Sequence, residues 1–304
     1  MGARRIEAVR SAASWGGLTT ASDGEVVQIR VSDTYPVDPT ITQGLADFLI
    51  QLYHGAELST VGIYIAPLSE VETICGAGSG GCYDPDQQTI VAPGENLPDG
   101  TSKETVLVHE LGHHVARSRV NLPWTAEDWG TKRWASAENI CARVADGTAF
   151  PGDEGSKYFL NPGEAFAESY RILNFQKQAW ATWTVLTPFN SDESFYPSAA
   201  ALDALRLDVV QPWTAPTVTA WSGRVANAKR TVKRAIATPL DGSMSVKLTR
   251  APAGASISIV DPRNGAVLAK GTRRASFQVC GKRNLALLVK TKKPGAFSAL
   301  YATP

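Results

Sequence analysis

One stretch of the sequence, His109-Glu110-Leu111-Gly112-His113, has the spacing of a metal-binding helix. The two histidines are four residues apart, so on a helix their imidazoles lie on one face, one turn apart. Zn²⁺ binds neutral imidazole nitrogens at about 2.0–2.1 Å in a tetrahedral site, and two ligands at this spacing suit it. Glu110 follows the first histidine and can act as general base toward a zinc-activated water. The stretch therefore predicts a catalytic zinc site on a helix.

The apolar patterns around this stretch predict its neighbouring elements. The first 24 residues have the composition of a weakly ordered tail. Thr101 and Glu104 fit a capping box, in which each side chain binds a free amide of the first helical turn. We expect strands over 26–31, 61–66 and 89–92, and helices over 39–53, 101–119, 161–178 and 197–207.

The third metal ligand lies outside the histidine stretch. A catalytic zinc site has three protein ligands and keeps its fourth position open. His114 follows His113 directly, so on a helix it points about 100° away and cannot share the metal. No motif surrounds His54. We therefore look for the third ligand among the downstream carboxylates.

A second predicted helix supplies two such carboxylates. It begins after Asn161, a favourable N-cap, with Pro162 at the first helical position. Glu164 and Glu168 lie on one face, where like charges repel unless a cation lies nearby. We predict that Glu164 is the third zinc ligand and that Glu168 accepts a hydrogen bond from the free nitrogen of a ligating histidine. The alternatives are a capping role for Glu164 and a solvated charge for Glu168.

Together these segments resemble a known family of zinc peptidases. The histidine stretch, followed farther along the chain by Glu164, is similar to the gluzincins. The run Glu164-Ala165-Phe166-Ala167-Glu168-Ser169-Tyr170-Arg171 most resembles the catalytic domain of anthrax lethal factor and its relatives. The resemblance covers roughly residues 61–178.

This resemblance implies a zincin-like α+β catalytic domain. It implies His109, His113 and Glu164 as zinc ligands, Glu110 as base, and a tyrosine near the second helix that stabilises the oxyanion. Tyr158 is the nearest match for that tyrosine, and an ordinary packed aromatic residue is the alternative. In such peptidases an edge strand above the active helix binds the substrate backbone. Residues 83–92 are the expected equivalent.

The chain has four cysteines, which allow three pairings. Cys75 and Cys82 flank a glycine-rich run that can bring them together, so we expect a disulfide between them. That bond would indicate an oxidising compartment, whereas two free thiols would fit the cytosol. A bond between Cys141 and Cys280 would follow by elimination.

The chain changes character near residues 212–216. Helical patterns stop there, and short alternating runs separated by Gly and Pro turns follow, which is typical of an antiparallel sandwich. The runs 258–265 and 295–301 are similar to small sandwich domains that follow the catalytic domains of secreted bacterial peptidases. We therefore predict a tail over 1–24, a zincin-like α+β catalytic domain over 25–212 and a small all-β sandwich domain over 213–304.

Charge divides along the same boundary. Residues 224–304 contain 16 Lys and Arg and only two acidic residues, whereas the preceding residues contain 14 and 27. The basic domain either docks on the acidic one or binds an anionic cell-surface polymer, and we favour the second. Nucleic acid is disfavoured because no recognition motif accompanies the charge.

Two functions remain in view at the level of sequence. The first is a secreted zinc endopeptidase that acts on protein or peptide substrates. The second is a surface-binding or adhesion protein with a structural zinc site, which would need a fourth protein ligand. No apolar run is long enough to span a membrane. The basic start of the chain has no signal-peptide core, so either the protein is not exported by that route or an export signal has been cut off and replaced by a new Met.

Overall fold

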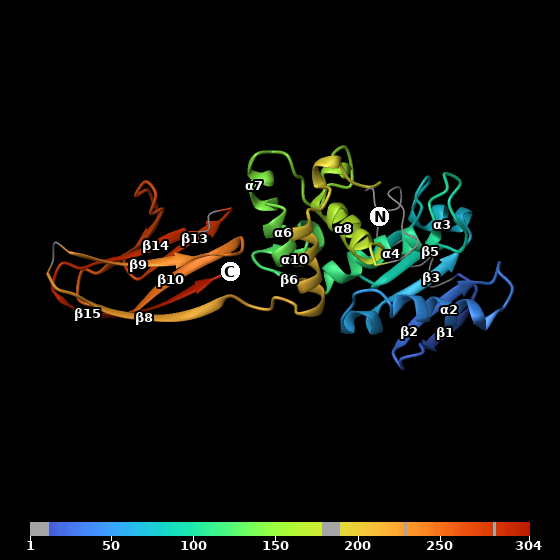
Figure 1. Cartoon of the computed structure of the whole chain (residues 1–304), viewed down its shortest axis with the longest axis horizontal. Coiled ribbons are helices and arrows are strands. Elements are labelled where there is room, and N and C mark those ends of the chain that lie inside the picture. The colour runs from blue at the N-terminus through green and yellow to red at the C-terminus, as the bar shows by residue number, and fades with distance from the viewer. Residues whose placement is uncertain (1–11, 178–188, 228–229, 282–283) are drawn as a thin grey trace.

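The computed structural model of the chain describes residues 12–177, 189–227, 230–281 and 284–304. These residues form two parts that lie side by side along the longest axis of the molecule (Figure 1). The first part ends at Val210 and combines helices with a five-stranded sheet; we call it the mixed part. The second part begins at Thr217 and contains two four-stranded sheets; we call it the β-part.

The sheet of the mixed part has the strand order β1-β2-β3-β5-β4. Its strands are β1 Ser14–Thr20, β2 Val26–Ser32, β3 Gly62–Ala66, β4 Cys82–Asp84 and β5 Thr89–Pro93. The central strands β2, β3 and β5 are parallel, whereas β1 and β4 are antiparallel to their neighbours. The expected tail was wrong for β1, because this strand pairs with β2 along its whole length. Residues 1–11 of that expected tail lie outside the described residues.

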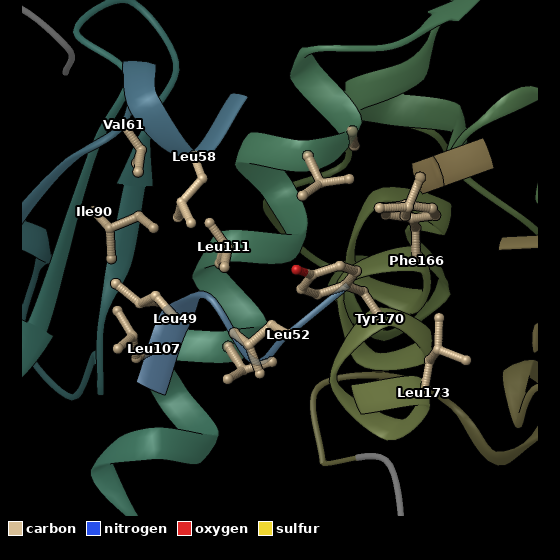
Figure 2. Close-up of a cluster of buried hydrophobic side chains, with 14 of the residues drawn as sticks. Leu49, Leu52, Leu58, Val61, Ile90, Leu107, Leu111, Phe166, Tyr170 and Leu173 are labelled. Carbon is tan, nitrogen blue, oxygen red and sulfur yellow. The ribbon is translucent and has the colours of Figure 1, made fainter. Parts of the chain in front are cut away.

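Helices cover both faces of this sheet because the side chains of a strand alternate between its faces. Ile63 and Ile65 of β3 face the main core, whereas Tyr64 between them faces a smaller cluster with α3. Figure 2 shows Leu49 of α2, Ile90 of β5 and Leu107 of α4 within the main core. The helices that the structure describes in the mixed part are α2 Pro39–Leu49, α3 Leu68–Cys75, α4 Lys103–Arg117, α5 Ala126–Trp129, α6 Lys132–Ala137, α7 Ile140–Ala145, α8 Pro162–Phe175 and α10 Ala199–Val210. Between these helices lie three short 3₁₀ turns, η1 Ala56–Thr60, η2 Tyr158–Leu160 and η3 Glu193–Phe195. A small hairpin of β6 Val120–Asn121 and β7 Trp124–Thr125 lies between α4 and α5.

The N-termini of α4 and α8 are fixed by side-chain caps. The helix α4 begins after Ser102, whose hydroxyl accepts a hydrogen bond from the backbone N–H of Thr105. The predicted capping box at Thr101 was therefore wrong by one residue. The helix α8 begins after Asn161, as predicted, and the side chain of Asn161 accepts a hydrogen bond from the N–H of Gly163.

The helices α4 and α8 pack unusually close to each other at Gly112. A Cβ atom on Gly112 would lie only 2.8 Å from the Cα atom of Ala167. Ordinary carbon contacts are about 3.5–4.0 Å, so only a residue without a side chain allows this approach. Gly112 thereby sets the distance between the two helices that carry the predicted site.

The β-part consists of two antiparallel sheets that share one core. Their strand orders are β13-β10-β15-β8 and β12-β11-β14-β9. The strands are β8 Thr217–Val225, β9 Thr231–Ala237, β10 Gly242–Arg250, β11 Ser256–Val260, β12 Val267–Gly271, β13 Arg274–Val279, β14 Asn284–Lys290 and β15 Gly295–Thr303. Strands β10 to β15 coincide with the short alternating runs of the sequence, which cover 244–248, 256–260, 266–269, 276–279, 285–289 and 297–301. We did not predict β8 and β9, whose residues are mostly exposed and give a weak alternating pattern.

A disulfide joins the two parts. Cys141 in α7 is bonded to Cys280, which follows β13. In addition, the backbone N–H of Asp241 donates to the hydroxyl of Ser136, and Gly242 packs against Lys132, whose ammonium would lie 2.5 Å from a Cβ atom on that glycine. These contacts, together with residues 211–216 of the chain, make up the junction between the mixed part and the β-part.

Candidate metal centre

Three side chains from α4 and α8 bring their metal-binding atoms together. The Nε2 atom of His109 lies 3.2 Å from Nε2 of His113 and 3.2 Å from Oε2 of Glu164. The Nε2 atom of His113 lies 3.5 Å from Oε1 of Glu164. Ligand atoms around a tetrahedral zinc ion are about 3.3 Å apart, so the three side chains fit such an ion. Within the described ranges, no other trio of His, Cys, Asp or Glu side chains is grouped in this way.

A second carboxylate orients His109. Oε1 of Glu168 lies 2.7 Å from Nδ1 of His109, so the ring presents Nε2 to the other ligand atoms. The other oxygen of Glu168 accepts hydrogen bonds from Arg171 at 2.8 Å and from the N–H of Phe189 at 3.1 Å. Glu168 and Arg171 are almost fully buried, so water does not compete for these hydrogen bonds. Neither Glu164 nor Glu168 is a solvated charge, and neither caps α8, whose cap is Asn161.

The electrostatics of this cluster favour positive charge between its members. Burial alone would lower the pKa of His109, but Glu164 and Glu168 beside it raise the pKa to about 10. Burial opposes the charged form of His113 too, and Glu164 raises its pKa. Burial would raise the pKa of Glu164, yet His113 and His109 hold it well below the usual range. A metal cation would satisfy the same requirement as the protons that the two histidines otherwise bind.

The carboxylate of Glu110 faces the same cleft as the ligand cluster. Glu110 is 7% exposed and lines the cleft beside His109 and His113. Burial raises its pKa, against the opposing effect of the two histidines. None of the described residues forms a hydrogen bond to its carboxylate. A buried carboxylate with a raised pKa and free oxygens is suited to accept a proton from a nearby water.

Tyr158 lies at the edge of the cluster. Its hydroxyl donates a hydrogen bond to Oε2 of Glu164 at 2.8 Å. Burial and the neighbouring Glu164 raise the pKa of Tyr158 far above its ordinary value, so the hydroxyl keeps its proton. Tyr158 belongs to η2, directly before α8, and this short connection directs its ring toward the ligand atoms. The hydroxyl can therefore act as a hydrogen-bond donor beside a bound metal.

The cleft has a volume of about 530 Å³ and passes along β4. Cys82 and Tyr83 of β4 line one side, and Glu164 of α8 lines another. Because β4 ends the sheet order, its outer backbone groups are not used by the sheet. The prediction that residues 83–92 form the edge strand was too wide, because β5 (Thr89–Pro93) pairs with strands on both sides.

A disulfide supports the rim of the cleft. Cys75 at the end of α3 is bonded to Cys82 at the start of β4, with a Cα–Cα distance of 5.7 Å. Both cysteines line the cleft. The bond that we expected between them is therefore present, and it fixes the start of the edge strand to the helix beside it.

Two residues near the cluster, Phe189 and Asn190, were not identified from the sequence. Phe189 packs its ring 5.7 Å from that of His109, between centroids, and Nδ2 of Asn190 lies 3.5 Å from Nε2 of the same histidine. No motif marks these two positions, and they reach the site only through the tertiary fold. His114 was correctly kept out of the metal cluster: its ring nitrogens contact the hydroxyl of Tyr83 and the carbonyl of Glu57, both at 2.9 Å. His114 thus links α4 to the edge strand.

Comparisons with known proteins give no family. No family model matches the chain, and no curated protein matches it. Part of the chain, 29% of its length, is similar to 85% of PliG, a periplasmic inhibitor of g-type lysozyme from Aeromonas hydrophila, with 11% identity and a TM-score of 0.24. The SPBc2 prophage-derived protein YomS is matched over 30% of this chain and 96% of its own, with 13% identity and a TM-score of 0.22.

A third solved structure is matched over a longer stretch. The family GH115 4-O-methyl-alpha-glucuronidase BtGH115A is similar over 66% of this chain and 39% of its own, with 11% identity and a TM-score of 0.20. All three TM-scores are too low to carry an argument about fold or activity. These similarities therefore do not assign the chain to a family.

Proposed function

We infer that this protein is a zinc-dependent endopeptidase of the gluzincin type. The observation that carries the proposal is the convergence of Nε2 of His109, Nε2 of His113 and the carboxylate of Glu164 at tetrahedral spacing. Glu110 adds a free carboxylate facing the same cleft. A catalytic zinc site needs three ligands, an open position and a general base, and these four residues supply the protein's share.

The proposed mechanism assigns each residue a task. When bound to His109, His113 and Glu164, Zn²⁺ supplies Lewis-acid chemistry that acidifies a water and polarises a carbonyl. Glu110 accepts the proton of the attacking water and passes it to the leaving amine. The hydroxyl of Tyr158 keeps its proton and donates a hydrogen bond to the carbonyl oxygen as negative charge develops there.

The proposed substrate is an extended segment of a protein or peptide. The edge strand β4 lies beside the cleft and has backbone donors and acceptors that the sheet does not use. An extended peptide can pair with such an edge by adding a strand. This pairing would hold the peptide over the carboxylate of Glu110 without demanding a particular side chain.

Two disulfides support an extracellular site of action. All four cysteines are bonded, as Cys75–Cys82 and Cys141–Cys280. Disulfides form and persist in oxidising compartments, so we include secretion in the proposal. None of the helices in the described ranges has the length and hydropathy of a membrane span.

The test compares two Glu→Gln substitutions on the same helix. Glu110→Gln should keep its zinc and lose about 10²–10⁴-fold in peptide cleavage, because only the base is removed. Glu104 lies in the first turn of α4 and does not line the cleft, so Glu104→Gln should retain activity. Zinc content is measured by elemental analysis and cleavage with a fluorogenic peptide library. Near-normal turnover by Glu110→Gln would refute the mechanism.

A second measurement addresses the structural-zinc alternative. Glu164→Ala should lose metal as well as activity, since it removes one of three ligands. An adhesion protein with a structural zinc site would show no proteolysis before or after treatment with a chelator. Zinc-loaded protein that cleaves no peptide of the library would therefore favour that alternative.

A further inference from the structure

The outer face of the sheet β13-β10-β15-β8 carries four cations. On β10, Val246 faces the core, whereas the next residue, Lys247, is exposed. The cross-strand partner of Lys247 is Arg274 of β13, which is exposed as well. Arg250 of β10 and Arg224 of β8 are exposed farther along the same sheet. We call Lys247, Arg274, Arg250 and Arg224 the basic face.

No exposed acidic residue offsets this charge within the β-part. Asp241 and Asp261 are the only acidic residues between positions 224 and 304, and each is 2% exposed. Asp261 is paired with Arg263 at 2.8 Å. Among the residues that the structure describes, none forms an ion pair with a cation of the basic face.

The junction with the acidic mixed part does not use the basic face. β10 begins at the junction, where a Cβ on Gly242 would lie 2.5 Å from the ammonium of Lys132. Lys247 is five residues farther along the strand, roughly 16 Å away at the rise of a β-strand, and Arg250 is farther still. Docking between the two parts therefore leaves these cations exposed to solvent.

The arrangement of the basic face is unfavourable for the protein alone. Like charges directly opposite each other on neighbouring strands destabilise a sheet, and Lys247 and Arg274 are such a pair. The other sheet avoids this: Lys233 of β9 pairs with Leu288, and Lys290 of β14 pairs with Thr231. A bound anionic group between Lys247 and Arg274 would turn their repulsion into attraction for a ligand.

The polar residues beside these cations point to a carbohydrate polymer. Ser245 and Ser276 are cross-strand partners in the next row of the same face and offer hydroxyls to sugar or carboxylate oxygens. The aromatic residues Trp221, Phe277 and Phe297 lie in or against the core instead. The face therefore lacks the aromatic platform on which proteins stack the bases of single-stranded nucleic acid.

We propose that the basic face binds an acidic polysaccharide. Its carboxylates contact Lys247 and Arg274, its hydroxyls contact the neighbouring serines, and Arg250 and Arg224 extend the contact along the sheet. Such binding holds the catalytic cleft of the mixed part close to a polyanionic surface. The binding needs neither zinc nor peptide cleavage, so it stands or falls separately from the proposed activity.

The experiment measures binding of the full chain to alginate, a polyuronate, by affinity electrophoresis. Neutral dextran and a single-stranded oligodeoxynucleotide serve as comparison probes. Retardation by alginate should be strong at about 0.01 M salt and absent near 1 M, where the Debye length falls from about 30 Å to about 3 Å. Dextran should cause none. Absence of alginate binding at low salt would overturn the proposal, and tighter binding to the oligonucleotide would replace the polysaccharide with nucleic acid.

Two pairs of substitutions then locate the binding face. Lys247→Gln with Arg274→Gln should raise the Kd for alginate about tenfold or more, because two close contacts to the polymer are lost. Lys233→Gln with Lys290→Gln removes the same charge from the opposite sheet and should change the Kd much less. Both pairs lie at exposed positions, and a cooperative unfolding transition for each variant shows that both proteins fold. Equal weakening by the two pairs would mean that net charge, and not the basic face, drives binding.

Discussion

Replacing Gly112 by alanine tests whether the close approach of α4 and α8 sets the geometry of the candidate metal site. The new Cβ would lie 2.8 Å from the Cα of Ala167, a backbone atom that cannot rotate away. Restoring an ordinary carbon contact of about 3.5 Å moves the helices apart by about 0.7 Å. His113 belongs to α4 and Glu164 to α8, so separating the helices moves these two ligands apart. Metal–ligand distances tolerate a change of only about 0.2 Å.

We expect Gly112→Ala to weaken zinc binding by at least about tenfold. Overpacking costs about 1–3 kcal/mol, of which the better helix propensity of alanine offsets about 1 kcal/mol. Gly44 is the matched control: it lies inside α2, and nothing lies within 4 Å of a Cβ placed there. Gly44→Ala should therefore stabilise the protein by up to about 1 kcal/mol and leave zinc affinity unchanged.

The assay pairs urea unfolding of the metal-free protein with a competition for zinc against a chromophoric chelator. The two variants should differ by about 2 kcal/mol in free energy of unfolding, and only Gly112→Ala should lose affinity. If Gly112→Ala binds zinc as tightly as the parent and is stabilised as much as Gly44→Ala, the helix contact does not set the ligand geometry.

Two further predictions concern pH and the disulfides. The pKa of His109 is raised from 6.5 to about 10 in the folded protein. Protonation of His109 therefore stabilises the metal-free protein fully below pH 6.5, and this stabilisation is lost as pH rises through 10. The zinc-loaded protein should lack this loss, and urea unfolding at several pH values measures the difference. Serine substitutions that remove Cys141–Cys280 open a much longer loop than those that remove Cys75–Cys82. Chain entropy therefore predicts that the free energy of unfolding falls by about 5 kcal/mol for the first pair and about 2.5 kcal/mol for the second, measured by thermal unfolding. Equal losses would contradict that reasoning.

The parts of the site that follow from local spacing were predictable from the sequence. The four-residue separation of His109 and His113 places both rings on one helix face, and the same separation orders Glu164 and Glu168. The caps behaved similarly, since Asn161 and the following proline begin α8 as their chemistry requires. The cap of α4 was placed one residue early because adjacent hydroxyl residues, Thr101 and Ser102, offer equivalent signals.

What the sequence could not supply depends on tertiary contacts. Phe189 and Asn190 contact His109 from a segment distant in the sequence, and no pattern in the residues around them predicts this contact. The strand β1 has two glycines and no fully buried residue, so its pairing with β2 outweighs a weak local pattern. The close approach at Gly112 depends on Ala167 of another helix, so the local sequence around Gly112 does not predict it.

The bond between Cys141 and Cys280 changes what a cut in the connection between the two parts can do. Residues 211–216 are largely exposed and carry no helix or strand, as is common for a segment open to proteolysis. If the proposed activity is correct, the protein meets peptidases, including other copies of itself, and such a segment is cut first. Because the disulfide bridges the junction independently of this connection, a nicked molecule remains one covalent unit, and the cleft stays attached to the β-part.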